Sequence, residues 1–277
     1  MIDKMLKEIF GTGLFEDIFK MVNQNIFSTN GNYSTARKLV ENLYESAVMP
    51  VALMLLCIYF LIALMDKFSS ENFTWEQMIR QMCMFLLGFF LIDRGFELLN
   101  LLFELGVDFV NTVNGWINGG ASGKIDGSLS DQIIKQFNDQ KFAKIGFIDD
   151  IFKFCYLFFP YILSWLLGMC VKIICYTRLI EIYIRAAFAP IAFSDFFHNG
   201  FQGSGWRFLK AFLAVCLQGA VILCIGAIFS ALMPVIFNLD GNTTFFSAMG
   251  RYFAILAAAV MLMFKSLSLT KEFVGVN

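Results

Sequence analysis

The chain has 277 residues, of which 58% are hydrophobic and 16% are charged, with a formal net charge of −1 and a mean hydropathy of +0.68. A soluble domain is typically about half apolar and roughly a quarter charged, so this balance excludes an ordinary soluble domain. The near-neutral charge also excludes the strong basic excess of a typical DNA-binding domain. The composition predicts an all-α, polytopic integral membrane helical bundle.

Four apolar runs along the chain are long enough, or nearly so, to cross a bilayer as helices. A helix needs about 20 mainly apolar residues to cross roughly 30 Å of hydrocarbon. The runs lie at 48–65, 154–171, 211–237 and 245–264. Charged or polar residues bound each run, so we expect each to be one membrane crossing.

A fifth crossing is expected between residues 74 and 92. Thr74-Trp75-Glu76-Gln77 has the capping-box pattern, which predicts a helix start. The apolar run is short and ends at Asp93 and Arg94, so at least one of these charges should lie near or inside the membrane. From there, polar residues recur at helical spacing, namely Asp93, Glu97, Asn100, Glu104, Asp108 and Asn111.

This polar stripe has two interpretations. On a membrane helix it should face other helices or water, because a charge facing lipid costs several kcal/mol. Alternatively, the helix leaves the bilayer early and the stripe is its solvated side. The sequence leaves both interpretations open.

Residues 173–197 are too charged for a lipid-exposed span. Arg178, Glu181 and Arg185 fall on one helical face at spacings of three and four, which suits a row of charge pairs. Pro190 then interrupts an apolar stretch. This pattern predicts a re-entrant or interfacial helix packed against the bundle, with a sixth crossing as the alternative. The residues assigned an intramembrane polar or structural role are Asp93, Arg94, Glu97, Lys172, Arg178, Glu181, Arg185 and Pro190.

The expected crossings divide the chain into four segments. They are an N-terminal amphipathic region at 1–43, two transmembrane helices at 44–110, an extracytoplasmic connection at 111–153, and three transmembrane helices at 154–277 that include the segment at 173–197. Basic residues gather in the 66–81 turn, the 172–210 segment and the C-terminal tail. The positive-inside rule then places the N-terminus outside and the C-terminus inside.

No catalytic motif stands in the sequence. A P-loop, a zinc-protease motif, a nucleophile elbow and a dinucleotide fingerprint are all absent. We therefore expect a protein that is not an enzyme, without catalytic residues, cofactor or metal. Intramembrane charges such as Asp93, Glu97 and Lys172 leave a small-solute or ion-coupled secondary transporter as an alternative. Transporters usually show internal repeats, and the two halves of this chain show no self-similarity.

The order of features resembles a known family. The amphipathic N-terminal region, Ser-Glu-Asn-Phe-Thr at 70–74 before a helix, the central connection and Arg185-Ala-Ala-Phe-Ala-Pro-Ile-Ala-Phe at 185–193 are similar to TrbL-like polytopic subunits of type IV secretion and conjugal transfer systems. The likeness covers roughly residues 40–270 and is greatest to short Gram-positive versions.

This resemblance implies a multi-pass channel or scaffold subunit in a bacterial cell membrane, in a Gram-positive host, that helps to move DNA and protein across it. Its implied partners are conjugation ATPases, other membrane subunits of the secretion complex and further copies of itself.

Contact with the transferred single-stranded DNA would fall on the outer connection. Proteins that follow a nucleic acid strand use basic grooves. Counted over 102–153 this connection is net acidic, and its basic residues before Lys153 are Lys124, Lys135, Lys141 and Lys144. We therefore expect a scaffold role with transient contact at these four lysines.

Overall fold

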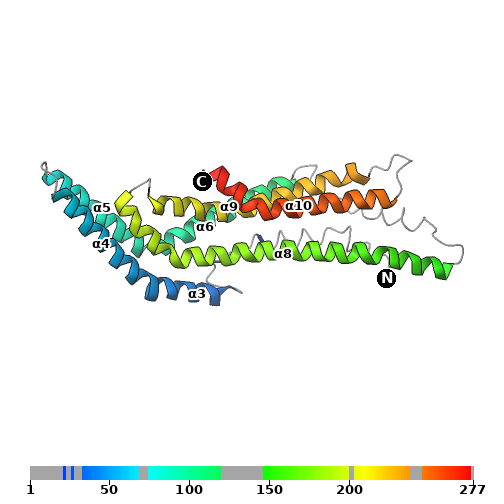
Figure 1. Cartoon of the computed structure of the whole chain (residues 1–277), viewed down its shortest axis with the longest axis horizontal. Helices are drawn as coiled ribbons and strands as arrows, with labels where there is room; N and C mark the ends of the chain where they lie inside the picture. Colours follow the sequence, from blue (N-terminus) through cyan, green and yellow to red (C-terminus); the bar gives the residue numbers. More distant parts are fainter. Residues whose placement is uncertain are drawn as a thin grey trace. The chain divides into compact units, whose positions relative to one another are not determined.

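The computed structural model describes residues 21–22, 26–27, 33–68, 74–119, 146–199, 203–237 and 245–275 (Figure 1). All regular structure in this part of the chain is helical. The predicted all-α helical bundle is confirmed. The chain forms two compact units: Met1–Gln24, Val110–Tyr176 and Gly219–Ser266 make up the first, and Asn25–Phe109, Thr177–Gln218 and Leu267–Asn277 make up the second.

The described part of the chain contains the following helical elements in chain order. They are α3 (Ser34–Leu43), the π-helical turn η1 (Tyr44–Val48), α4 (Met49–Phe68), α5 (Trp75–Asp93), α6 (Gly95–Gly119), α8 (Gly146–Asn199), α9 (Ser204–Phe237) and α10 (Phe245–Val274). The expected outer connection at 111–153 thus begins inside α6 and ends inside α8. Residues 120–145 of it lie outside the described residues.

Four helical segments in the described residues are long and apolar enough to cross a membrane. They are Ser34–Asp66, Leu157–Asp195, Ser204–Phe229 and Gly250–Val274. Each contains, or largely overlaps, one of the four apolar runs of the sequence. The expected crossing at 74–92 is α5, which is not among the four, because Glu76 and Arg80 occupy its first turns and shorten its apolar run.

Helix α5 nevertheless begins where the sequence predicted. The Thr74 backbone is extended and its carbonyl oxygen accepts hydrogen bonds from the amides of Gln77, at 3.1 Å, and Met78, at 3.3 Å. The Thr74 side chain makes no capping hydrogen bond. The capping-box sequence therefore places the helix start correctly, while main-chain groups close the first turn.

A single helix, α8, replaces two elements that were expected to be separate. It runs for 54 residues from Gly146 to Asn199, about 80 Å at 1.5 Å per residue, and is one continuous ribbon in Figure 1. The segment 173–197 is thus the second half of α8 and not a separate re-entrant or interfacial helix. Pro190 is buried within it. A proline removes one backbone donor, and packing inside a membrane bundle tolerates that loss.

Helix α3 leads into α4 through a widened turn. The turn η1 spans Tyr44–Val48, directly before Pro50 in α4. Pro50 cannot donate to the carbonyl four residues earlier, and its ring crowds that carbonyl, so a wider π-type turn relieves the clash. The Ser46 hydroxyl donates to the Asn42 carbonyl in the same turn. Pro50 therefore accounts for the π-helical turn, given that α3, η1 and α4 follow one another without a break.

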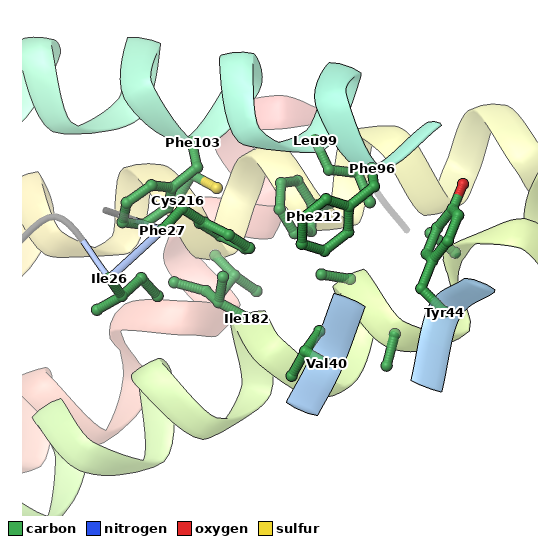
Figure 2. Packing of buried hydrophobic residues seen from close by; sticks show 14 of the residues in the cluster. Ile26, Phe27, Val40, Tyr44, Phe96, Leu99, Phe103, Ile182, Phe212 and Cys216 are labelled. Atoms are coloured by element: carbon green, nitrogen blue, oxygen red, sulfur yellow. The ribbon is translucent and has the colours of Figure 1, made fainter. Parts of the chain in front are cut away.

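Aromatic side chains form the core of the second unit (Figure 2). The Phe27 ring meets the rings of Phe96, Phe103 and Tyr183 edge to face, with centroids 5.8, 5.1 and 5.7 Å apart. Such pairs add to the free energy gained by burial alone. The Tyr183 hydroxyl also donates to the Ile26 carbonyl at 2.7 Å. A short N-terminal stretch is thereby fixed against α6 and α8.

The first unit has its own core, built from the first half of α8, the second half of α9 and most of α10. Leu157, Leu223 and Leu256 are buried in it. The rings of Phe229 and Tyr252 pack with centroids 6.1 Å apart. Each unit therefore buries apolar surface of its own.

Tyr44 links the widened turn to the break between α5 and α6. Its side chain is buried, and its hydroxyl donates to the Ile92 carbonyl at 2.7 Å. Arg94 interrupts the helix immediately afterwards, and Gly95 starts α6. A methyl group on Gly95 would meet the Tyr44 hydroxyl and lie 2.6 Å from Phe193 Cε2. Only glycine lets the chain pass this close to Tyr44 and Phe193.

This contact yields a stability test with a matched control in the same helix. We expect Gly95→Ala to lower the free energy of unfolding by about 1–3 kcal/mol, because the added methyl group overpacks a filled site. Gly115→Ala should leave stability unchanged or raise it by up to about 1 kcal/mol, since nothing lies within 4 Å of its Cβ position and alanine favours helix. Thermal unfolding of both purified variants in detergent measures the difference. Equal melting temperatures would contradict the close approach at Gly95.

Candidate functional site: a polar layer at the middle of α9

A buried arginine joins α8 to α9. The Arg178 side chain on α8 is 2% exposed. Its Nε donates to the Val215 carbonyl at 3.1 Å, and its Nη2 donates to the Cys216 carbonyl at 2.9 Å. The planar guanidinium presents several donors in a fixed geometry, so it can bond two consecutive carbonyls at once. Arg178 therefore fixes one turn of α8 against one turn of α9.

The position of Cys216 sets the depth of this contact. Cys216 stands on α9 six residues after Lys210, inside the apolar run 211–237. At 1.5 Å per residue it lies about 9 Å from Lys210 along the helix axis, and the hydrocarbon layer is about 30 Å thick. The Arg178 guanidinium bonded to this turn thus lies within the bilayer, where a charge must face the bundle interior and be hydrogen bonded.

The other two charges predicted to share a row with Arg178 pair with each other. Arg185 Nη2 and Nε donate to Glu181 Oε1 at 2.6 and 2.9 Å, and both side chains are partly buried. The sequence placed all three residues on one face but could not assign the partners, because spacings of three and four both bring side chains within reach. The structure pairs Glu181 with Arg185 and directs Arg178 towards the α9 backbone.

Helix α6 touches α9 at the same level. A methyl group on Gly106 would lie 2.8 Å from Cys216 Cβ and 3.4 Å from the Cys216 carbonyl carbon. Glycine thus lets α6 lie directly against the turn of α9 that accepts the Arg178 hydrogen bonds. Sequence reasoning missed Gly106. Its position between Phe103 and Val107 on the apolar face of α6 is the signal that could have found it, since small residues mark close helix contacts in membranes.

The two faces of α6 differ in polarity. Phe96, Leu99 and Phe103 are buried in the core of the second unit. On the opposite side, the exposed polar residues are Glu97, Glu104, Asp108 and Asn111. Asn100 Nδ2 donates to Glu104 Oε1 at 3.2 Å along this side. The predicted acidic-polar stripe is therefore an exposed face of α6, which we call the acidic face.

Asp93, Arg94 and Glu97 mark the break between α5 and α6. Arg94 Nη1 lies 2.9 Å from Glu97 Oε1, and Arg94 Nε lies 3.6 Å from Asp93 Oδ2. All three side chains are about half exposed or more. The sequence placed Asp93 and Glu97 on one continuous helix, but the break puts Asp93 on α5. Exposed ion pairs contribute little stability, so these residues form a local cluster at the junction.

Asp195 is a further residue that sequence reasoning missed. Its Oδ2 accepts hydrogen bonds from the Ser204 amide, at 2.7 Å, and from the Ser204 hydroxyl, at 2.6 Å. Ser204 is the first residue of α9. An acidic side chain is favourable at a helix N-terminus, so Asp195 of α8 stabilises the start of α9.

The remaining predicted site residues lie elsewhere in the sequence. Lys172 is partly buried on the part of α8 that belongs to the first unit, and Pro190 is buried in the second unit. The lysines proposed for DNA contact are Lys124, Lys135, Lys141 and Lys144, and they lie outside the described residues.

The Arg178 contact predicts unequal effects for two identical substitutions. We expect Arg178→Lys to lower the free energy of unfolding by about 1–3 kcal/mol, because a lysine keeps the buried charge but loses the two-carbonyl bonding geometry. Arg185→Lys should cost less than about 1 kcal/mol, since its ammonium can still reach Glu181 from a partly exposed position. Thermal unfolding in detergent compares the two. Equal destabilisation would contradict the anchoring role of Arg178.

Comparison with known protein families identifies the family of this chain. The family model described as TrbL/VirB6 plasmid conjugal transfer like protein matches residues 17–190. This range covers well over half of the chain and includes α3 to α6, Arg178, the Glu181–Arg185 pair and Pro190. No curated protein and no solved structure matches the chain.

Proposed function

Because the chain belongs to the TrbL/VirB6 plasmid conjugal transfer-like family, we propose that it is a channel or scaffold subunit of a conjugative type IV secretion system. The family is one of conjugal transfer and type IV secretion subunits. Four membrane-capable helices make the chain a multi-pass membrane protein. The finer role that we propose is to help DNA and protein across the cell membrane.

The family match is the observation that carries this proposal, and the polar layer supports the scaffold part of it. Arg178, held by two carbonyls near the middle of α9, fixes α8 against α9. Gly106 brings α6 onto the same turn. A bundle whose helices are joined inside the membrane can hold a defined shape while other subunits act on it.

The transporter alternative loses part of its basis. It drew on Asp93 and Glu97 as intramembrane charges, and both now lie with Arg94 at the exposed break between α5 and α6. Lys172 stands on α8 in the first unit, away from that cluster in sequence. We therefore retain the transfer subunit as the proposed function.

The proposed partners follow from the role. Conjugation ATPases would supply the energy, and other membrane subunits and further copies of this chain would complete the complex. We place the protein in the cell membrane of a Gram-positive bacterium, with its N-terminus outside and its C-terminus inside. Our proposal gives the chain no catalytic role and no cofactor.

Deletion tests the proposed function. Removing the coding sequence from its conjugative element should abolish DNA transfer, measured as transconjugants per donor, and supplying the wild-type chain in trans should restore it. A strain that still transfers DNA at the normal frequency without the chain would refute the proposal. Growth of the donors and abundance of the other transfer proteins serve as controls.

Contact with DNA can be tested separately from the scaffold role. We expect combined replacement of Lys124, Lys135, Lys141 and Lys144 by Ala to lower transfer without lowering protein abundance, because those side chains would lose their attraction for phosphate. The control is Lys265→Ala with Lys271→Ala on α10, which should leave transfer unchanged. Normal transfer by the four-lysine variant would remove direct DNA contact and leave the scaffold role.

A further inference from the structure

One side of α8 is apolar and exposed along most of the helix. Thirteen large apolar side chains within residues 154–191 are exposed, and Thr177 is the one exposed polar side chain among the described residues of this stretch. The apolar residues recur three or four positions apart, as in Ile162, Leu166 and Met169, so they share one side of the helix. We call this side the apolar face of α8.

The charged residues of the same stretch do not interrupt this face. Lys172, Arg178, Glu181 and Arg185 are all buried or partly buried. Arg178 bonds the α9 backbone, and Glu181 pairs with Arg185. Because the charges lie inward and the apolar side chains outward, the apolar face must meet either lipid or the apolar surface of another protein.

Lipid alone cannot cover the apolar face of α8. From Phe154 to Ile191 the face extends about 55 Å along the helix axis, at 1.5 Å per residue. The hydrocarbon layer is about 30 Å thick, and a helix tilted by about 40° has only roughly 40 Å of its length inside it. About ten residues of the face therefore lie outside the hydrocarbon. A contiguous apolar surface outside lipid marks an interaction site for protein.

We propose that the apolar face of α8 packs against the same face of a second copy of this chain. The proposal adds a defined interface to the proposed scaffold role, and it rests on that role for the presence of several copies in one complex. Copies in one membrane share an orientation, so a twofold axis between them lies along the membrane normal. The two α8 helices then run parallel, and each residue of the face meets its own counterpart.

A second copy fits this face in length, polarity and area. The partner must present an uncharged apolar helix face about 55 Å long, and α8 itself has one. Thirteen large apolar side chains, each about half exposed, offer on the order of 1,000 Å² of surface. A stable interface buries about 800 Å² per partner, so the area is sufficient for pairing of two copies.

The test places single cysteines on the apolar face. Ile162→Cys and Ile180→Cys are made in a full-length chain whose 7 native cysteines are replaced by serine or alanine. Their positions are 45% and 59% exposed. The matched control is Ile58→Cys on α4, which is 50% exposed. Each variant is expressed without other transfer proteins, and its abundance and its elution in size exclusion are compared with those of the parent chain.

Oxidation of the isolated membranes with copper phenanthroline then joins cysteines that lie together in two copies. We expect disulfide-linked dimers of Ile162→Cys and of Ile180→Cys at several-fold the yield from Ile58→Cys, which reports chance collision in the membrane. Chains carrying Ile162→Cys and Ile180→Cys with different tags are also expressed together. The two positions are about 27 Å apart along α8, so parallel pairing should give no dimer that carries both tags.

Three results would overturn the proposal: no dimer from either α8 variant, an equal yield from Ile58→Cys, or abundant dimers that carry both tags. Dimers that form only when the other transfer proteins are present would show that a different subunit organises this face. The cross-linking needs no DNA transfer. Its failure with transfer still dependent on the chain removes the α8 pairing alone, whereas cross-linking with transfer independent of the chain removes the proposed function alone.

Discussion

Two hydrogen bonds from the Arg178 guanidinium to consecutive α9 carbonyls determine how the middle of this membrane protein is arranged. A buried charge in hydrocarbon is unfavourable unless it is bonded on nearly every side, so the turn of α8 that carries Arg178 must lie against Val215 and Cys216. Gly106 brings α6 onto that same turn. Three helices of the second unit thus meet at one level.

A second constraint acts where α4 and α5 leave the core of their unit. Pro50 widens the turn before α4, and Arg94 interrupts the chain between α5 and α6. The Tyr44 hydroxyl joins these irregularities through the Ile92 carbonyl. Beyond them α4 and α5 pack on each other, with the Phe60 and Phe85 rings 4.7 Å apart. The Tyr44–Ile92 hydrogen bond therefore fixes the place at which the α4–α5 pair leaves the core. A scaffold subunit needs such fixed directions to present surfaces to lipid and to partners.

The sequence predicted what depends on local pattern and composition. The four long apolar runs all lie in membrane-capable helices, and the start of α5 falls at Trp75 as the capping-box pattern indicated. The family resemblance based on residues 70–74 and 185–193 agrees with the family match over 17–190. Helical periodicity also placed Glu97, Glu104 and Asp108 on one face, which the structure leaves exposed.

What the sequence could not supply depends on partners that are distant in the chain. Pro190 and the charges after Lys172 suggested a separate helix, whereas α8 continues because Arg178 is satisfied by α9 and Glu181 by Arg185. Gly106 and Tyr44 become informative only when Cys216 and Ile92 are known to lie beside them. Arg178, whose spacing from Glu181 suggested a charge pair, instead donates hydrogen bonds to the α9 backbone.

The central claim is that the Arg178 guanidinium joins α8 to the Val215 and Cys216 carbonyls of α9 inside the bilayer. Electron cryomicroscopy of the full-length chain in lipid nanodiscs tests it most directly, since the density shows both the helices and the lipid layer. The account predicts the Arg178 guanidinium within hydrogen-bond distance of the Val215 and Cys216 carbonyls inside the lipid layer, and acyl chains around the exposed Ile58 of α4. Density that places the Arg178 side chain away from α9, or this contact outside the lipid layer, would contradict it.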